Sequence, residues 1–285
     1  MLQKIAIKML GDFSVVADGR CVVDATAKLT KPWQLFCYLA LNREHVTPSS
    51  VLLQELWGGE ELADPANVLK NTVYALRREL AGPVKPAESP ILFRAGGYCL
   101  NGHIKWSVDT ERFEQLCEKA ERCTGGSEAK MEAWRKAEGA FRGELLPQLA
   151  GEVWVMRAAR GFTRRYLASA RALCACLAGE NAYGELLDVA SRASVTDPLD
   201  EDIALWTFRA LDALHMQRAI VIAYNKTARY FEEEMGRPLC AEIGSIYAAA
   251  AEAVNKTEQD LRPFGTSCPT RCAASAATAV RLLQL

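Results

Sequence analysis

Residues 67–80 read NVLKNTVYALRREL, and the predicted fold follows from this stretch. At about 100° per residue, an α-helix gathers apolar side chains on one side, here Leu69, Val73, Leu76 and Leu80. The polar side chains form a stripe on another side, made of Asn67, Lys70, Asn71, Tyr74, Arg77 and Arg78. The stripe holds three cations and no acid, with Glu79 toward its edge. Arginine and lysine can bind guanine edges, asparagine can bind adenine, and all three can hold phosphates. By itself such a face is more often merely solvated, and only together with the surrounding segments does the pattern favour a helix that reads DNA.

The segments around this helix predict a winged helix-turn-helix. A helix can begin at Pro32, and residues 47–50, TPSS, suit the start of a second helix with Thr47 as its N-cap. Asp64 or Pro65 can begin the helix that carries the stripe. Two hairpins flank these helices, because Asp-Gly and Gly-Gly pairs between apolar runs mark tight turns, at residues 18–19 and 95–97. Strands, three helices and a hairpin are the element order of this fold.

The rest of the chain is predicted to be helical, since strand signals vanish from Val108 onward. Residues 198–203, PLDEDI, resemble residues 238–243, PLCAEI, at an offset of 40. Helix pairs that recur at such a spacing are typical of stacked helical-hairpin repeats. We therefore predict an α+β winged helix-turn-helix followed by an all-α domain in which helix pairs stack as a solenoid-like repeat array rather than as a closed bundle. The expected boundaries are 1–103 for the winged helix, 104–256 for the helical domain and 257–285 for a flexible tail.

The composition limits the classes of function. The formal net charge of −1 gives no overall basic field, so a DNA-binding surface must be local. Neither the histidines nor the cysteines show metal-ligand or catalytic spacing, including His45, His103, His215 and the tail residues Cys268 and Cys272. We expect no metal, no cofactor and no enzymatic activity. The sequence shows neither a signal-peptide pattern nor an apolar run long enough for a membrane, which predicts a cytoplasmic protein.

Two parts of the sequence resemble known families. The first resembles the winged-helix effector domain of OmpR/PhoB-type response regulators, at 52–57 LLQELW, 71–80 NTVYALRREL and 96–100 GGYCL. The second resembles the bacterial transcriptional activator domain of the SARP family of antibiotic regulatory proteins, at 108–109 VD, 143–147 GELLP, 197–201 DPLDE and 234–236 EMG. The sequence shows neither a receiver domain nor a G-x-x-x-x-G-K-[ST] loop, so we expect no phosphorylation or nucleotide control within it.

This resemblance implies a sequence-specific DNA-binding transcription regulator, an activator that recruits RNA polymerase. In such proteins the third helix enters the major groove of double-stranded DNA, and the wing meets the backbone and minor groove. The helical domain of such proteins is tetratricopeptide-like, so the resemblance implies an all-α, tetratricopeptide-like helical repeat domain here. Protomers bind direct repeats, which implies self-association on DNA. The loop between the second and third helices touches the polymerase, which points here to Glu60 and Glu61. An acidic solvated loop without a partner is the alternative for these two residues. For the whole chain, the alternative is a helical-repeat scaffold whose winged helix mediates protein contacts.

Further positions complete the expected DNA surface. Arg94, beside the second hairpin turn, is the wing's candidate for a groove or phosphate contact. Ser49 and Ser50 can anchor a phosphate at the start of the second helix, where free N–H groups and the helix dipole attract anions. Solvated serines beside a Thr47 cap are the equal alternative. Along the stripe, base reading is expected of Lys70, Asn71 and Tyr74, and phosphate contact of Arg77 and Arg78.

Overall fold

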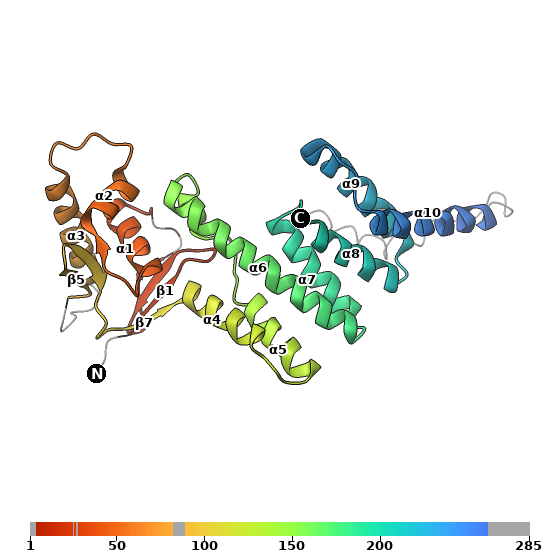
Figure 1. Ribbon diagram of the computed structural model, residues 1–285, viewed down its shortest axis with the longest axis horizontal. Helices are drawn as coiled ribbons and strands as arrows, with labels where there is room; N and C mark the ends of the chain where they lie inside the picture. The colour runs from red at the N-terminus through yellow and green to blue at the C-terminus, as the bar shows by residue number, and fades with distance from the viewer. Residues whose placement is uncertain (1–3, 25, 27, 82–88, 262–285) are drawn as a thin grey trace. The chain divides into compact units, whose positions relative to one another are not determined.

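The computed structural model describes residues 4–24, 26, 28–81 and 89–261. The chain divides into two compact units, and it passes between them more than once (Figure 1). The first unit comprises Met1–Glu121 and Gly139–Arg165, and the second comprises Arg122–Glu138 and Tyr166–Leu285.

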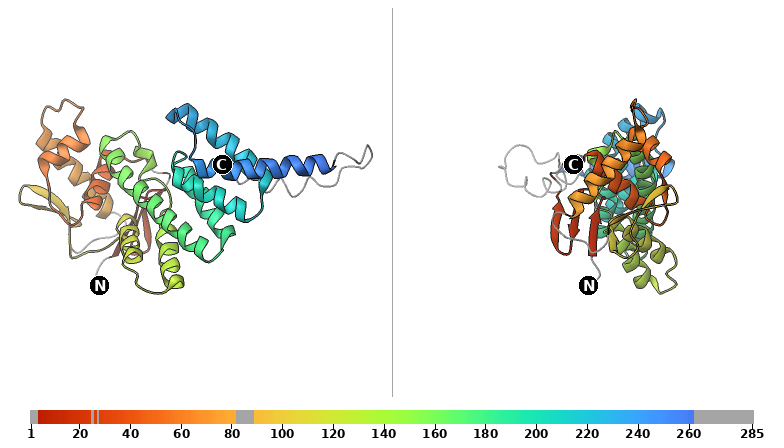
Figure 2. Two further views of the ribbon diagram at one scale, coloured as in Figure 1. Left: turned by 45° about the vertical axis from the view of Figure 1, so that its right-hand side comes forward. Right: turned by 90° about the vertical axis from the view of Figure 1, so that its left-hand side faces the viewer.

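A four-stranded sheet opens the first unit, with the strand order β3-β2-β1-β7. The strands are β1 (Lys4–Lys8), β2 (Ser14–Ala17), β3 (Arg20–Val23) and β7 (Lys105–Val108). The expected turn at Asp18 and Gly19 is confirmed, because both residues have a positive φ, 46° and 81°, as a two-residue hairpin of this kind requires. Helix α1 (Lys31–Leu41) lies beside this sheet (Figure 2). Its aromatic side chains make the contact, with the ring centre of Trp33 6.1 Å from that of Phe13 and the ring centre of Phe36 6.0 Å from that of Trp106.

Strand β7 belongs to the first sheet, although it follows residue 103, the predicted end of the winged helix. It pairs in parallel with β1, so that Ile5 lies opposite Trp106 and Ile7 opposite Val108. A division between residues 103 and 104 would separate this strand from the sheet it completes. The compact first unit instead runs through helix α4 (Asp109–Glu121).

Helices α2 (Ser49–Trp57) and α3 (Pro65–Ala81) follow α1, as expected. A second sheet, in the order β4-β6-β5, completes the winged helix. Its strands are β4 (Thr47–Pro48), β5 (Ile91–Arg94) and β6 (Gly97–Leu100). The prediction that Thr47 caps α2 is wrong, because Thr47 pairs with Tyr98 in this sheet and α2 begins at Ser49 with no side-chain cap. Glycine and proline are typical of a helix end, and the Gly82-Pro83 pair that follows α3 lies outside the described residues.

The segment GELLP also belongs to the first unit. Leu145 forms an isolated antiparallel bridge with Leu10, just after β1. The N–H of Leu146 donates to the carbonyl of Met9 at 2.8 Å, and the N–H of Gly11 donates to the carbonyl of Glu144 at 2.8 Å. This part of the chain therefore closes onto the end of β1, about 135 residues earlier in sequence.

The second unit is helical throughout its described residues, as the sequence predicts. It holds α5 (Ser127–Glu138), the later part of α6 (Val153–Gly179), α7 (Tyr183–Thr196), α8 (Glu201–Ala213), α9 (Gln217–Met235) and α10 (Ala241–Leu261). Each helix from α7 to α10 packs against the next, and the core of the last three contains Phe208, Leu211, Ile220, Phe231 and Ile243. Helix α10 extends beyond the expected tail boundary at residue 257, and the remainder of that tail, residues 262–285, lies outside the described residues.

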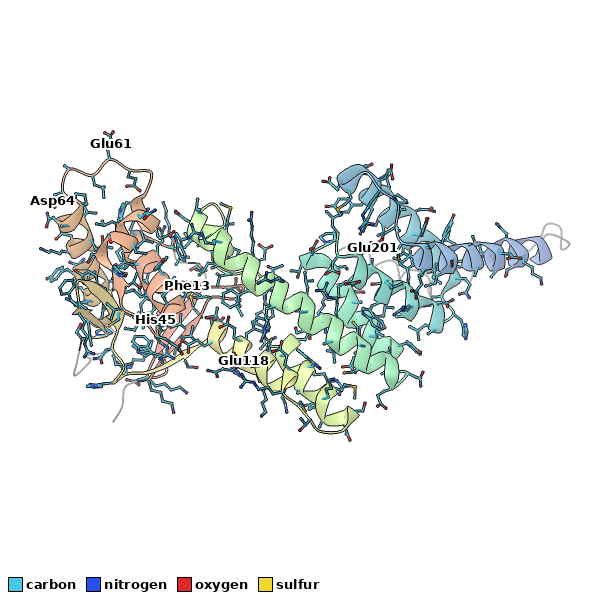
Figure 3. The ribbon with its side chains drawn as sticks, in the orientation of Figure 1. Phe13, His45, Glu61, Asp64, Glu118 and Glu201 are labelled. Atoms are coloured by element: carbon cyan, nitrogen blue, oxygen red, sulfur yellow. The ribbon has the colours of Figure 1, made fainter. Side chains whose placement is uncertain are left out.

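The internal repeat marks two equivalent helix starts. Helix α8 begins after Asp200, whose carboxylate accepts from the N–H of Ile203 at 3.1 Å. Helix α10 begins at the corresponding point of the second copy, after Cys240. The copies also contact each other, because Glu201, labelled in Figure 3, accepts a hydrogen bond from the N–H of Cys240 at 2.6 Å.

Candidate nucleic-acid interface

Helix α3 divides into a buried and an exposed side, as its sequence predicts. Asp64 caps the helix, since its carboxylate accepts from the N–H of Asn67 at 3.0 Å. Proline then occupies the first position of the helix, where its fixed φ fits and its missing N–H costs nothing. The apolar side chains are all buried, namely Leu69, Val73, Leu76 and Leu80. This burial forces the polar stripe outward.

Five of the six stripe residues are exposed, namely Asn67, Lys70, Asn71, Tyr74 and Arg78. Their side chains make no hydrogen bond or ion pair with the rest of the described chain. Tyr74 is 68% exposed, so its ring and its hydroxyl are both open to a partner. One exposed face of α3 therefore presents two cations, two side-chain amides and a phenol hydroxyl, from Lys70, Arg78, Asn67, Asn71 and Tyr74.

Arg77, the sixth residue of the stripe, has a different environment. It is half-buried, and its Nη2 donates to the carbonyl of Ile91 in β5 at 2.8 Å. Its Nε is buried without a hydrogen-bond partner. The sequence predicts phosphate contacts for both Arg77 and Arg78. In the structure, only the Arg78 side chain makes no hydrogen bond or ion pair with the described residues.

The two serines at the start of α2 also differ from one another. The N–H and the Oγ of Ser49 both donate to the carbonyl of Gly96, at 3.2 Å and 2.9 Å. Ser50 is exposed and makes no such contact. Ser49 is therefore occupied by the protein's own wing, while Ser50 remains available to an anion.

The wing is the hairpin of β5 and β6. Its turn residues Ala95 and Gly96 both have a positive φ, 46° and 77°, so that Gly96 suits its position and Ala95 is strained. Arg94 is exposed next to this turn, as expected. Phe93 was not expected to contribute, yet it is 59% exposed, with its ring 5.1 Å from that of Tyr98. An apolar residue directly beside a hairpin turn is the sequence signal that could have revealed it.

The acidic loop between α2 and α3 holds its two glutamates differently. Glu60 forms an ion pair with Lys31 at 3.2 Å. Lys31 also donates to the carbonyl of Leu56 and lies 5.6 Å from the ring centre of Trp57. Glu61 stands at the tip of the loop and points away from the protein (Figure 3), without an ion pair to the described residues.

Other kinds of site are not seen in the described part of the chain. It contains no group of three or more His, Cys, Asp or Glu side chains able to hold a metal ion. Its cysteines are all free, and Cys268 and Cys272 lie outside it. None of its helices is long and apolar enough to cross a bilayer.

Comparison with known protein families finds a match over half of the chain. The family model for the bacterial transcriptional activator domain matches residues 108–250, half of the sequence. The chain belongs to the bacterial transcriptional activator domain family. This is a family of transcription regulators and not a class of enzymes. The resemblance to SARP-type regulators is thereby confirmed.

Two individual proteins are similar to this family member. The regulatory protein DnrI of Streptomyces peucetius is 30% identical over 147 residues, which is 49% of this chain and 53% of DnrI. The chain thus matches about half the length of that relative. Mycobacterium tuberculosis EmbR, solved in complex with a low affinity phosphopeptide, has a TM-score of 0.66 and 17% identity, over 90% of this chain and 72% of EmbR. The likeness to EmbR concerns the fold, and it confirms the expected fold class.

Proposed function

We propose that this protein is a sequence-specific, cytoplasmic DNA-binding regulator, an activator that recruits RNA polymerase at promoters with direct repeats. The exposed face of α3 carries the proposal. Its Lys70, Asn71, Tyr74 and Arg78 are the residue types that bind base edges and phosphates, and they are exposed together without protein partners in the described chain. Membership of the activator-domain family supports the same conclusion.

The positions of these residues suggest a division of tasks. Lys70, Asn71 and Tyr74 lie within the first ten residues of α3, and the N-terminal part of such a helix reaches base edges when it lies in the major groove. Arg78 lies near the end of the helix, where it can hold a phosphate. Ser50 at the start of α2 and Arg94 on the wing are both exposed, and in this proposal they contact the DNA backbone on either side of the groove.

The proposal is tested by selecting bound duplexes from a random DNA pool and titrating the best site with salt. Each phosphate contact steepens the log–log dependence of affinity on salt by about 0.9. We expect Arg78→Ala to reduce the slope by about that amount. Lys130→Ala is the matched control, because Lys130 is exposed on α5 and should leave the slope unchanged.

Two outcomes would contradict the proposal. A selection that enriches no sequence would remove sequence-specific binding. An Arg78→Ala slope equal to that of the unchanged protein would show that α3 does not face the phosphates. The first outcome would favour the alternative function, a helical scaffold whose winged helix contacts proteins.

Self-association on DNA follows from direct repeats. Two protomers in tandem present the same α3 face to successive major grooves, so the two half-sites should be spaced by about one helical turn of DNA, 10–10.5 base pairs, or a multiple of it. Changing the spacing of the selected repeats by about half a turn should therefore weaken binding of the second protomer.

A further inference from the structure

Adjacent arginines on α3 point to different partners. Arg77 donates to the carbonyl of Ile91 at 2.8 Å, and its Nε is buried against the protein. Arg78 is exposed and makes no hydrogen bond or ion pair with the described chain. Ile91 begins β5, the first strand of the wing. The recognition helix is therefore attached directly to the base of the wing.

A second attachment holds the wing at its tip. The carbonyl of Gly96, in the turn, accepts from both the N–H and the Oγ of Ser49, the first residue of α2. The next residue, Gly97, lies so close to β4 that an added Cβ would stand 2.2 Å from the carbonyl oxygen of Thr47. Only glycine allows the wing to approach β4, the strand just before α2, this closely.

We propose that Arg77 and Ser49 are positioning residues that clamp the wing to the helix-turn-helix, and that neither side chain contacts a phosphate. The clamp makes α3 and the β5–β6 hairpin one rigid DNA-binding surface. The inference deepens the proposed function and rests on it, because it assumes that the wing meets DNA. It assigns to Arg77 and Ser49 a task that their sequence positions do not suggest.

The physical need for a clamp comes from the hairpin itself. A two-stranded hairpin by itself is marginally stable in water, and the third strand of this sheet, β4, contributes only Thr47 and Pro48. A hydrogen bond from a charged guanidinium to a carbonyl is stronger than one between neutral groups. Fixing the wing before DNA arrives removes the entropy that would otherwise be lost on binding. The loss of Arg77 should therefore loosen the wing in the free protein and weaken its contact with DNA.

The first experiment needs no DNA. Amide hydrogen exchange across residues 91–100 is compared in Arg77→Ala and in Arg78→Ala, which removes the same charge one position away. We expect about tenfold faster exchange in Arg77→Ala alone, as the loss of a charge-assisted hydrogen bond implies. Ser49→Ala and Ser50→Ala form a second matched pair, with faster exchange expected around Gly96 only for Ser49→Ala. Equal exchange within both pairs would overturn the clamp.

The second experiment uses DNA and a double-mutant cycle with Arg94→Ala, which removes the wing's own contact. If Arg77 acts through the wing, Arg77→Ala should cost much less affinity in the Arg94→Ala background than alone. Arg78→Ala, by contrast, should cost the same factor in both backgrounds. Additive losses for Arg77 and Arg94 would show a direct phosphate contact and refute the positioning role. A protein that binds no duplex at all would refute the proposed function instead, while the exchange comparison would still decide the clamp.

Discussion

The carboxylate of Asp109 accepts hydrogen bonds from the backbone N–H of Met9, at 2.9 Å and 2.8 Å to its two oxygens. It also accepts from the N–H of Leu10 at 2.9 Å and from that of Thr110 at 2.9 Å. Asp109 begins α4, and Met9 follows β1. One side chain at the start of the activator-domain match therefore satisfies the backbone at the end of the first strand.

We expect Asp109→Asn to lower the free energy of unfolding of the first unit. An asparagine turns an NH2 group toward N–H donors, so at least one buried donor loses its acceptor, at a cost of about 1–3 kcal/mol. Burial raises the pKa of Asp109, because it disfavours the charged carboxylate. The backbone N–H donors stabilise that charge and counteract part of the rise. Urea denaturation followed by tryptophan fluorescence measures the change.

Asp12→Asn is the control for this substitution. Asp12 is exposed in the same unit and makes no hydrogen bond or ion pair with the described residues. Its replacement should leave the unfolding midpoint unchanged. Equal midpoints for Asp12→Asn and Asp109→Asn would show that the Asp109 hydrogen bonds contribute nothing measurable.

Glu201 supplies a prediction about pH in the second unit. Its carboxylate lies 2.9 Å from Arg237 and accepts from the N–H of Cys240. The hydrogen bond from Arg237 lowers the pKa of Glu201, and the Cys240 N–H acts in the same direction, against the effect of burial. A lowered folded-state pKa means that this stabilisation is present above the unfolded pKa of about 4.3 and is lost as pH falls through the folded value.

The difference in stability between the unchanged protein and Glu201→Gln should therefore depend on pH. It should be largest near neutral pH and shrink as the solution is acidified below about pH 4. Thermal unfolding of both proteins across this range gives the measurement. Glu252→Gln, at an exposed position of α10, should show no such trend. A difference that grows on acidification would mean that the ion pair does not favour the charged carboxylate.

Local signals in the sequence predicted most of the fold, and long-range pairing accounts for what they missed. The turns at Asp18-Gly19 and Ala95-Gly96 require positive φ, a property of the residues themselves. Strand β7 was missed because its partner β1 lies about 100 residues earlier, and four residues carry too little alternation to predict a strand. Thr47 was misassigned for a similar reason, since its pairing with Tyr98 could not be seen from TPSS alone.

At the candidate site, too, the sequence predicted what depends on local periodicity and missed what depends on tertiary contacts. Helical periodicity predicted the open face of α3, because burial of Leu69, Val73 and Leu76 fixes where the other side chains point. It could not distinguish Arg77 from Arg78. That distinction depends on the carbonyl of Ile91, which the fold alone brings to one of them.

Asn71 is predicted to read a base. Its side chain is exposed in the middle of α3 and can form a bidentate contact with adenine. Asn71→Ala should cost about 1–3 kcal/mol on the best site and relax the preference at one position. Binding is measured against a panel of single-base variants, with Arg78→Ala for comparison, which should weaken all sequences alike. A uniform loss for Asn71→Ala would give Asn71 a positioning role instead.

The acidic loop leads to a prediction about polymerase recruitment that separates its two glutamates. Lys31 pairs with Glu60 and contacts Leu56 and Trp57, so Glu60 helps to shape the loop. Glu61 has no such partner in the described chain and is free to meet a basic surface of RNA polymerase. The loop is poorly suited to lie against DNA, because its charge has the same sign as the phosphates.

Replacing Glu60 and Glu61 together with alanine should leave promoter affinity intact or slightly improved, yet lower transcription in a purified system at full promoter occupancy. Glu61→Ala alone should reproduce most of this loss, because its carboxylate is the one that faces outward. Lys31→Gln, which leaves Glu61 in place but removes the brace beneath the loop, should lower transcription less. Undiminished transcription from Glu61→Ala at full occupancy would refute the polymerase contact. A parallel loss of DNA binding would show that the loop supports the winged helix rather than a partner.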